Sequence, residues 1–106
     1  SPQGIKKLME TRSMYVALDQ EKIVGTVSLK ENFISALFVD PSQFFSGIGK
    51  KLMSYAEQES KLLGHNECSL TSTLNAIDFY ERIGYTQIEK IPDEKYGTTI
   101  KMHKML

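Results

Sequence analysis

The sequence predicts a single domain built on one mixed sheet of the α/β (α+β) class, with helices packed on the sheet. Three observations lead to this class. In residues 23–30, Ile23, Gly25, Val27 and Leu29 alternate with Val24, Thr26, Ser28 and Lys30, and this period of two is typical of a β-strand. Residues 48–63 and 76–83 carry apolar side chains three and four positions apart, the period of a helix. The chain has 106 residues, which is room for one domain over residues 1–106.

Composition excludes several classes of function. Apolar residues make up 41% and charged residues 25% of the chain, values typical of a folded globular protein. Thirteen Lys and Arg balance thirteen Asp and Glu, so we expect no nucleic-acid partner and no anionic membrane partner. The longest apolar run, Met14 to Leu18, is far shorter than the ~20 residues of a membrane span. With one cysteine and no signal-peptide core, a cytoplasmic location is expected.

The first half of the chain predicts a short helix and then a meander of three strands. Ile5, Leu8 and Met9 recur at helical spacing after Ser1-Pro2, which favours a helix over Gln3–Glu10. Polar turns at residues 19–22 and 31–32 separate the strands that follow. These strands are Met14–Leu18, Ile23–Lys30 and Phe33–Val39, the last apolar on both faces as in a central strand.

The second half predicts helix, strand, helix and two strands. Gly64 ends the helix of residues 48–63, and Cys68–Thr71 is the next strand. Ser72 or Thr73 caps the second helix, and Gly84 ends it. The last strands are Tyr85–Ile91 and Thr98–Lys104, joined by a loop over residues 92–97. The strand–helix–strand unit over residues 33–71 is expected to be a right-handed parallel crossover.

Two glycines lie where the long helix begins, directly after Phe33–Val39. A helix start leaves backbone N–H groups without partners and carries partial positive charge. Gly47 and Gly49 would let an anion, most simply a pyrophosphate, approach this backbone. Alternatively, the turn into the helix needs these glycines for its own geometry. The pattern matches neither a P-loop nor the dinucleotide fingerprint.

Residues 72–85 form a second informative segment, a capped amphipathic helix in which Phe79 and Tyr80 would be core aromatics by pattern alone. In their order and spacing the two segments resemble the GNAT superfamily of acetyl-CoA-dependent N-acetyltransferases, from about Met14 to the end of the chain. The first block is matched by Val39, Pro41 and Gly47-Ile48-Gly49. The second is matched by Thr73, Ala76, Phe79, Tyr80, Glu81, Gly84 and Tyr85.

The resemblance implies a GNAT-like acyl-CoA N-acyltransferase fold that lacks the usual first strand and helix. It implies an N-acetyltransferase that moves an acetyl group from acetyl-CoA directly to a primary amine of a small-molecule or peptide acceptor. Acetyl-CoA, released as coenzyme A, would be a co-substrate, and no metal is expected. The alternative is a catalytically weak or inactive module that binds coenzyme A or serves as a scaffold.

The resemblance also implies roles for individual residues. Backbone groups of Leu37, Phe38 and Val39 would pair with the pantetheine arm as an added strand would. Backbone amides would hold the pyrophosphate, those of Phe44, Phe45, Ser46, Gly47, Ile48, Gly49 and Lys50. Tyr80 would be the catalytic residue, standing near the sulfur and protonating the departing thiolate.

The chain departs from the family pattern in two places. Phe44 stands where relatives usually have Arg or Gln, and neither it nor Phe45 can bond a phosphate through its side chain. Ser46, Lys50 or Lys51 could add donors, while the aromatic pair could also block the site. The first residue is Ser, and elements that help wall the acceptor side in relatives are missing. We expect a truncated chain, a neighbouring subunit such as a homodimer partner, or an open acceptor site.

Other reactive side chains are expected to be structural. His65 and His103 are isolated surface residues with no metal-ligand cluster around them. Cys68 begins a core strand and is expected to be buried. The polar side chains of residues 93–96 are expected to form an ordinary turn. No general base is assigned, because Phe33–Val39 holds no acid and only Glu31 and Asp40 flank it.

Overall fold

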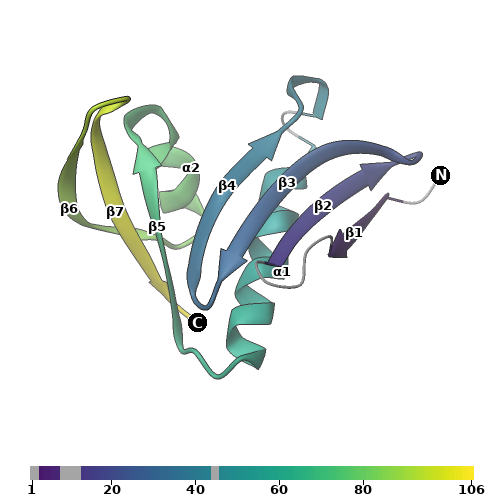
Figure 1. Cartoon of the computed structure of the whole chain (residues 1–106), viewed down its shortest axis with the longest axis horizontal. Coiled ribbons are helices and arrows are strands. Elements are labelled where there is room, and N and C mark those ends of the chain that lie inside the picture. The colour runs from purple at the N-terminus through teal and green to yellow at the C-terminus, as the bar shows by residue number, and fades with distance from the viewer. Residues whose placement is uncertain (1–2, 8–12, 44–45) are drawn as a thin grey trace.

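The computed structural model describes residues 3–7, 13–43 and 46–106. One sheet of seven strands runs through this part of the chain, in the order β1-β2-β3-β4-β5-β7-β6 (Figure 1). The strands are β1 (Gln3–Lys7), β2 (Ser13–Asp19), β3 (Lys22–Lys30), β4 (Phe33–Val39), β5 (Glu67–Thr73), β6 (Thr86–Asp93) and β7 (Gly97–Met105). The helices are α1 (Ile48–Leu62) and α2 (Ile77–Arg82), with short 3₁₀ turns at Pro41–Gln43 and Leu74–Ala76.

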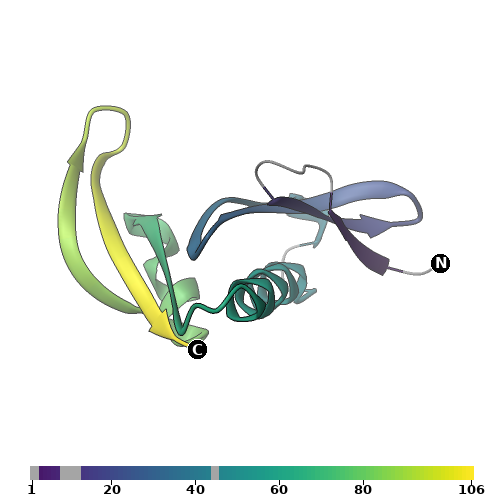
Figure 2. The same ribbon diagram turned by 60° about the horizontal axis from the view of Figure 1, so that its bottom comes forward.

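The sheet divides between β4 and β5, the pair of parallel strands predicted around the crossover. Among the described residues these strands form only two residue pairs, Phe33 with Ser69 and Ile34 with Leu70. Every other neighbouring pair in the sheet is antiparallel and longer. Beyond Ile34 the two strands diverge, so that β1–β4 and β5–β7 form two wings (Figure 1). The connecting helix α1 lies against one face of the β1–β4 wing (Figure 2).

The core lies between α1 and the sheet, and its cluster of buried side chains includes residues from both wings. Leu52 and Ala56 of α1 are completely buried, as the helical spacing predicted, and so is Met53. Leu62 and Leu63, which the spacing placed on the same face, are instead 81% and 63% exposed. Burying a side chain such as Leu52 or Met53 contributes about 1.5–3 kcal/mol. Gly25 in β3 is where the helix comes closest to the sheet, because a Cβ there would lie 2.8 Å from the Leu52 Cδ1 atom. The core therefore needs a residue without a side chain at this position.

The prediction of a helix over Gln3–Glu10 is wrong. Residues 3–7 form β1, which pairs antiparallel with β2, and residues 8–10 lie outside the described part of the chain. Helical spacing over so few residues is weak when a neighbouring strand offers a full set of backbone hydrogen bonds. Ile5 lies three positions before Leu8, as in a helix, but a strand that buries one side chain fits the same residues equally well.

The structure corrects three further details and confirms the rest of the element order. Strand β4 is central in the sheet order, but its two faces are not both buried: Phe33 and Phe38 are 41% and 57% exposed. The second helix has no side-chain cap, since the Ser72 hydroxyl donates to the Thr73 carbonyl and Thr73 makes no capping bond. The last loop is also shorter than predicted, because Pro92, Asp93 and Gly97 belong to strands.

Strand β6 lies at one end of the sheet and pairs with β7 alone. Seven of its eight residues are exposed, and Ile91 is partly buried. The register shifts between Gln87 and Glu89, which marks a β-bulge. None of the helices in the described ranges is long and apolar enough to cross a membrane.

Candidate active site

The divergence of β4 from β5 leaves one backbone edge of β4 without a partner strand. Ala36 has a left-handed backbone (φ 52°), and the pairing of β4 with β3 shifts register beside it. The Asp40 N–H donates to the Val24 carbonyl of β3 at 2.8 Å. Alternate residues of a strand turn their polar groups to opposite edges, so Leu37 and Val39 direct theirs toward the open side. Phe38, the third residue predicted for this role, pairs with Thr26 of β3.

The start of α1 lies at the same end of the molecule. Gly47 precedes the helix with φ 84°, a conformation that favours glycine, and no side chain caps the helix. The first backbone bond of the helix runs from the Lys51 N–H to the Gly47 carbonyl at 3.0 Å. The N–H groups of Ile48, Gly49 and Lys50 therefore have no acceptor within the helix. Three amides of the predicted anion cradle thus have no backbone acceptor in the part of the chain that the structure describes.

Two other predicted donors differ from expectation. The Ser46 hydroxyl and the Ser46 N–H both donate to the Gln43 carbonyl, so this side chain is already engaged. Lys51 lines a separate cavity, described below. Phe44 and Phe45, the aromatic pair that was expected either to weaken or to block the site, lie outside the described residues.

Gly49 lies where three predicted elements meet. A Cβ on Gly49 would lie 3.2 Å from the Phe79 Cζ atom of α2 and 3.5 Å from the Val39 Cγ2 atom of β4. The absence of a side chain therefore lets α2 pack directly against the first turn of α1. Gly47 is open to solvent, whereas Gly49 serves packing, so the two glycines of the motif have different reasons to be glycine.

Tyr80 lies beside this contact on α2. Its ring is 5.2 Å from the Phe79 ring and 6.0 Å from the Tyr85 ring, both in edge-to-face geometry. Burial raises the pKa of the Tyr80 phenol, so the hydroxyl stays protonated around neutral pH. This hydroxyl forms no hydrogen bond to another described residue. It is therefore available as a proton donor next to the junction of β4, α1 and α2.

The side chains that were expected to be structural make contacts within the fold. Cys68 is completely buried, and burial raises the pKa of its thiol. His65 and His103 pair with Glu31 (3.1 Å) and Glu67 (3.4 Å). The Asp93 carboxylate accepts the N–H groups of residues 95 and 96, the ordinary turn that was predicted.

The two acids that flank β4 are both engaged. Glu31 contacts His65 at the end of β4 where it pairs with β5. The Asp40 carboxylate accepts the Ser42 N–H at 2.9 Å, and this bond lowers its pKa. Neither acid gains a proton-accepting role from these contacts, and the general base stays unassigned.

Sequence reasoning missed Glu57 of α1, which accepts a hydrogen bond from Tyr85 at 2.7 Å. A signal was present, because Glu57 follows the buried Met53 by four positions and so shares its helix face. A charged residue on a buried helix face needs a partner. The sequence did not say which residue supplies it.

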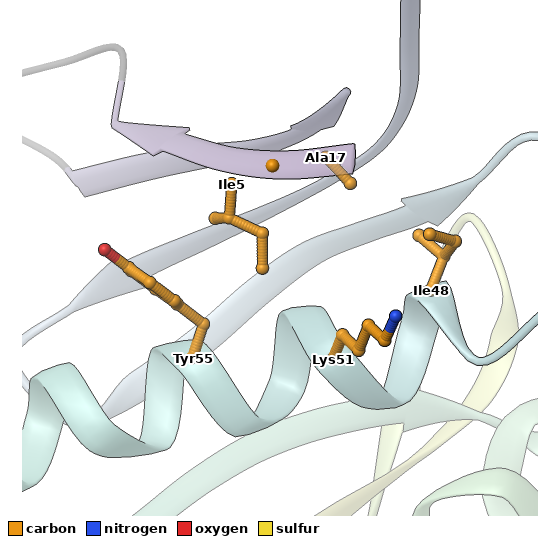
Figure 3. A pocket seen from close by; sticks show the side chains of 6 residues that line it. Ile5, Ala17, Ile48, Lys51 and Tyr55 are labelled. Atoms are coloured by element: carbon orange, nitrogen blue, oxygen red, sulfur yellow. The ribbon is translucent and has the colours of Figure 1, made fainter. Parts of the chain in front are cut away.

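A cavity of about 300 Å³ lies elsewhere, between α1 and the strands β1 and β2 (Figure 3). It is lined by Gly4, Ile5, Ala17, Ile48, Lys51 and Tyr55. Ile5 points from β1 toward the helix, and Tyr55 and Lys51 lie along the helix below it (Figure 3). Of the residues predicted for the cofactor, Ile48 and Lys51 border this cavity, whereas the junction residues Gly49, Val39 and Phe79 do not line it.

Comparisons with known proteins match the whole chain and its fold. A family model described as an acetyltransferase (GNAT) domain matches residues 1–106. A GCN5-related N-acetyltransferase from Rhodopseudomonas palustris superposes with a TM-score of 0.85 at 23% identity, over 90% of this chain and 62% of that one. A streptothricin acetyltransferase from Bacillus anthracis, titled putative and solved with acetyl coenzyme A, gives a TM-score of 0.81 at 22% identity, covering 92% and 64%.

An aminoglycoside 6'-N-acetyltransferase solved with coenzyme A gives a TM-score of 0.78 at 21% identity, covering 90% of this chain and 73% of that one. At these identities the solved structures show a shared fold. The present chain spans less than two thirds of the length of the first of them. It has the mixed sheet of those proteins in a shorter form.

Proposed function

Because the chain belongs to the GNAT family of acetyltransferases, we propose that it transfers an acetyl group from acetyl-CoA directly to a primary amine. The observation that carries the proposal is the junction at Gly49. There the open edge of β4, the uncapped start of α1 and the helix with Tyr80 come within van der Waals reach of one another. A cofactor that is extended, anionic at one end and reactive at the other needs these three features together.

The chain offers acetyl-CoA two kinds of backbone contact. The free edge of β4 at Leu37 and Val39 can take the pantetheine amides as an added strand would be taken. The free N–H groups of Ile48, Gly49 and Lys50 can receive the pyrophosphate, aided by the dipole of the 15-residue α1. Since these contacts use backbone atoms, the aromatic residues at positions 44 and 45 would weaken binding less than they would at a site built from side chains.

Tyr80 is the proposed general acid. The amine nitrogen attacks the thioester carbonyl carbon, the carbon–sulfur bond breaks, and the sulfur leaves with the electron pair as a thiolate. The Tyr80 hydroxyl donates a proton to that sulfur, and the nitrogen loses its extra proton to solvent. Because burial raises the pKa of Tyr80, the donor enters each cycle protonated, and its phenolate regains a proton from solvent after the transfer. The nucleophile belongs to the substrate, so no covalent enzyme intermediate forms.

The proposed acceptor is a small molecule or peptide with a primary amine, and a homodimer is a proposed way to complete the acceptor side. Structural neighbours whose titles name aminoglycoside, streptothricin and nourseothricin acetyltransferases support testing amine antibiotics first. The part of the acceptor site that this shorter chain contributes would be the wing β5–β7 and the exposed Phe38 side chain.

The test measures coenzyme A binding and acetyl transfer separately. Calorimetry with coenzyme A and with pantetheine, which lacks the pyrophosphate, should show tighter binding of coenzyme A. Thiol release from acetyl-CoA should then require an amine from a panel of amino sugars, amino acids and peptide N-termini. Matched acceptors with a hydroxyl in place of the amine are the control.

Each outcome decides between the two functions. Thiol release that depends on the amine supports the transferase. Binding of coenzyme A without turnover for any amine favours a binding or scaffold module. Lack of binding, seen also as no rise in melting temperature at saturating acetyl-CoA, would contradict the transferase and the coenzyme A-binding module and would favour a structural role without a cofactor.

A further inference from the structure

Three polar side chains from separate elements meet below the turn that follows α2. The Tyr85 hydroxyl donates to the Glu57 Oε2 atom at 2.7 Å, and the Lys104 ammonium donates to the Glu57 Oε1 atom at 3.1 Å. Tyr85 is 1% exposed, and the Glu57 side chain is 13% exposed. Both carboxylate oxygens of Glu57 are thus engaged in a largely water-free setting, where such bonds are strong and directional.

Tyr85 contacts Tyr80 in two ways. The Tyr85 N–H donates to the Tyr80 carbonyl at 3.0 Å, which closes the turn after α2. The two rings meet edge to face, with centroids 6.0 Å apart and planes at 70°. Lys104 covers the intervening Gly84, since a Cβ there would lie 3.1 Å from the Lys104 Cε atom. A shift of Tyr85 would therefore move both the backbone and the ring of Tyr80.

The helix that carries Tyr80 cannot hold that residue in place by itself. Helix α2 has six residues, none of them fully buried, and no side-chain cap. Isolated helices of this length are unstable in water. The Tyr80 ring lies between the Phe79 ring at 5.2 Å and the Tyr85 ring at 6.0 Å. Phe79 rests on α1 at Gly49, and Tyr85 is bonded to α1 at Glu57.

We propose that Tyr85, held by Glu57 and Lys104, is a positioning residue that sets the place of the Tyr80 hydroxyl. The inference rests on the proposed function for its consequence in catalysis. This arrangement explains how the short, exposed helix α2 can hold a proton donor in a defined geometry. Phe79 and Tyr85, the two rings beside Tyr80, both contact α1, the helix that begins at the proposed pyrophosphate site.

The kinetic test deletes the Tyr85 hydroxyl and keeps the ring. Tyr85→Phe should lower kcat by about tenfold to a hundredfold at an unchanged KM for acetyl-CoA, since small misplacements of a catalytic group have effects of this size. The double variant Tyr80→Phe/Tyr85→Phe should be no slower than Tyr80→Phe alone, because the effect of Tyr85 passes through Tyr80. Losses that multiply in the double variant would overturn the inference.

Glu57 provides a graded second test. Glu57→Gln keeps an oxygen that can accept the Tyr85 hydroxyl, so it should retain more activity than Glu57→Ala. Glu59→Gln, two positions along the same helix, is the matched control for the change of charge. Tyr55→Phe is the matched control for loss of a tyrosine hydroxyl on α1. Equal activity of Glu57→Gln and Glu57→Ala would contradict a hydrogen bond that positions Tyr85.

A readout that needs no turnover separates this inference from the proposed function. With ¹³C-labelled tyrosine, the Tyr80 signal is identified by its loss in Tyr80→Phe. It should shift or broaden in Tyr85→Phe and Glu57→Ala, which both remove the hydrogen bond, and stay unchanged in Glu59→Gln. If the wild-type protein transfers no acetyl group, the proposed function fails and the Tyr80 signal alone decides on positioning. An unchanged signal in both Tyr85→Phe and Glu57→Ala would overturn the inference, and Glu57→Ala decides if Tyr85→Phe does not fold.

Discussion

The two ends of strand β4 differ in how their backbone groups are hydrogen-bonded. At its first residues β4 is joined to β5, and the joint is reinforced: the Ser69 N–H donates to the Asn32 carbonyl at 2.9 Å, and the Asn32 amide donates to the Glu67 carbonyl at 3.1 Å. At its last residues β4 has left β5, and Val39 lies beside Gly49 of α1 instead. One end is closed by hydrogen bonds, while the other presents unused backbone groups.

The difference shows how a stable sheet can carry an open ligand site. Bonds at the closed end hold the angle between the two wings, so the open end can remain unpaired without losing its shape. A binding site whose polar groups are already in place loses less entropy when its ligand binds. Changes at the closed end should therefore affect mainly the stability of the fold, and changes at the open end should affect mainly the proposed chemistry.

The largest expected effect is at the closed end. Ile34 pairs with Leu70 and is 2% exposed, so Ile34→Ala should lower the free energy of unfolding by about 2–5 kcal/mol. Chemical denaturation measures this, and kcat at a temperature where the variant is folded should change little. Ile88→Ala, at a side chain that is 48% exposed, is the control and should lose about 0.5 kcal/mol or less. Equal losses at both sites would remove the distinction.

At the open end, Tyr80→Phe should lower the rate of acetyl transfer by about a hundredfold or more, the usual contribution of a general acid. The dissociation constant for coenzyme A and the melting temperature should stay close to those of the wild type, because the ring remains. Kinetics and calorimetry on the same preparation check this, with Tyr55→Phe as control. Wild-type rates in Tyr80→Phe would assign the proton to another donor.

The third prediction concerns alkaline pH. Tyr85 ionises near pH 10 in an unfolded chain, but burial and the Glu57 carboxylate raise its pKa in the fold. Above about pH 10 the folded state keeps a proton that the unfolded state releases, so stability is full below that pH and falls as pH rises. The slope approaches about 1.4 kcal/mol per pH unit for one such tyrosine.

Denaturation curves between about pH 8 and pH 11 measure this slope. It should be shallower in Tyr85→Phe, while the remaining slope reflects Tyr80 and Cys68, whose pKa values burial also raises. A slope that Tyr85→Phe leaves unchanged would mean that other groups cause the alkaline loss.

The smallest effect tests the bend between the two ends. Ala36 has φ 52°, which an L-residue adopts at some expense, so Ala36→Gly should stabilise the fold by about 0.5–1 kcal/mol. Ala17→Gly, the same change in the buried strand β2, should destabilise by a similar amount. Denaturant midpoints for the pair give the comparison, and a loss in Ala36→Gly would contradict strain at the bend.

Much of the fold could be predicted because its signals are local. Alternation in Ile23–Lys30, turn residues at positions 19–22 and helical spacing around Leu52 each lie within one element. Strand β1 could not be predicted, because the spacing of Ile5 fits a helix or a strand equally well. The pairing of residues 3–7 with the edge of β2 decides between them. Tertiary pairing overrode the local preference.

The candidate site also has parts that could be predicted from the sequence and parts that could not. The glycines at positions 47 and 49 and the tyrosine at position 80 lie in recognisable blocks, and the structure brings their elements together. The bond between Glu57 and Lys104 joins residues 47 positions apart, so no local pattern announces it. The left-handed conformation of Ala36 could not be predicted either, because an alanine in a sequence does not indicate a positive φ.

Strand β6 has a consequence for how the protein behaves at high concentration. A terminal strand with open backbone groups invites a strand of another molecule to continue the sheet, which leads to fibres. Here Glu89 and Lys90 are exposed, Pro92 contributes no N–H, and a bulge interrupts the register. These features hinder growth of the sheet at β6, so self-association of the native protein would have to use a different surface.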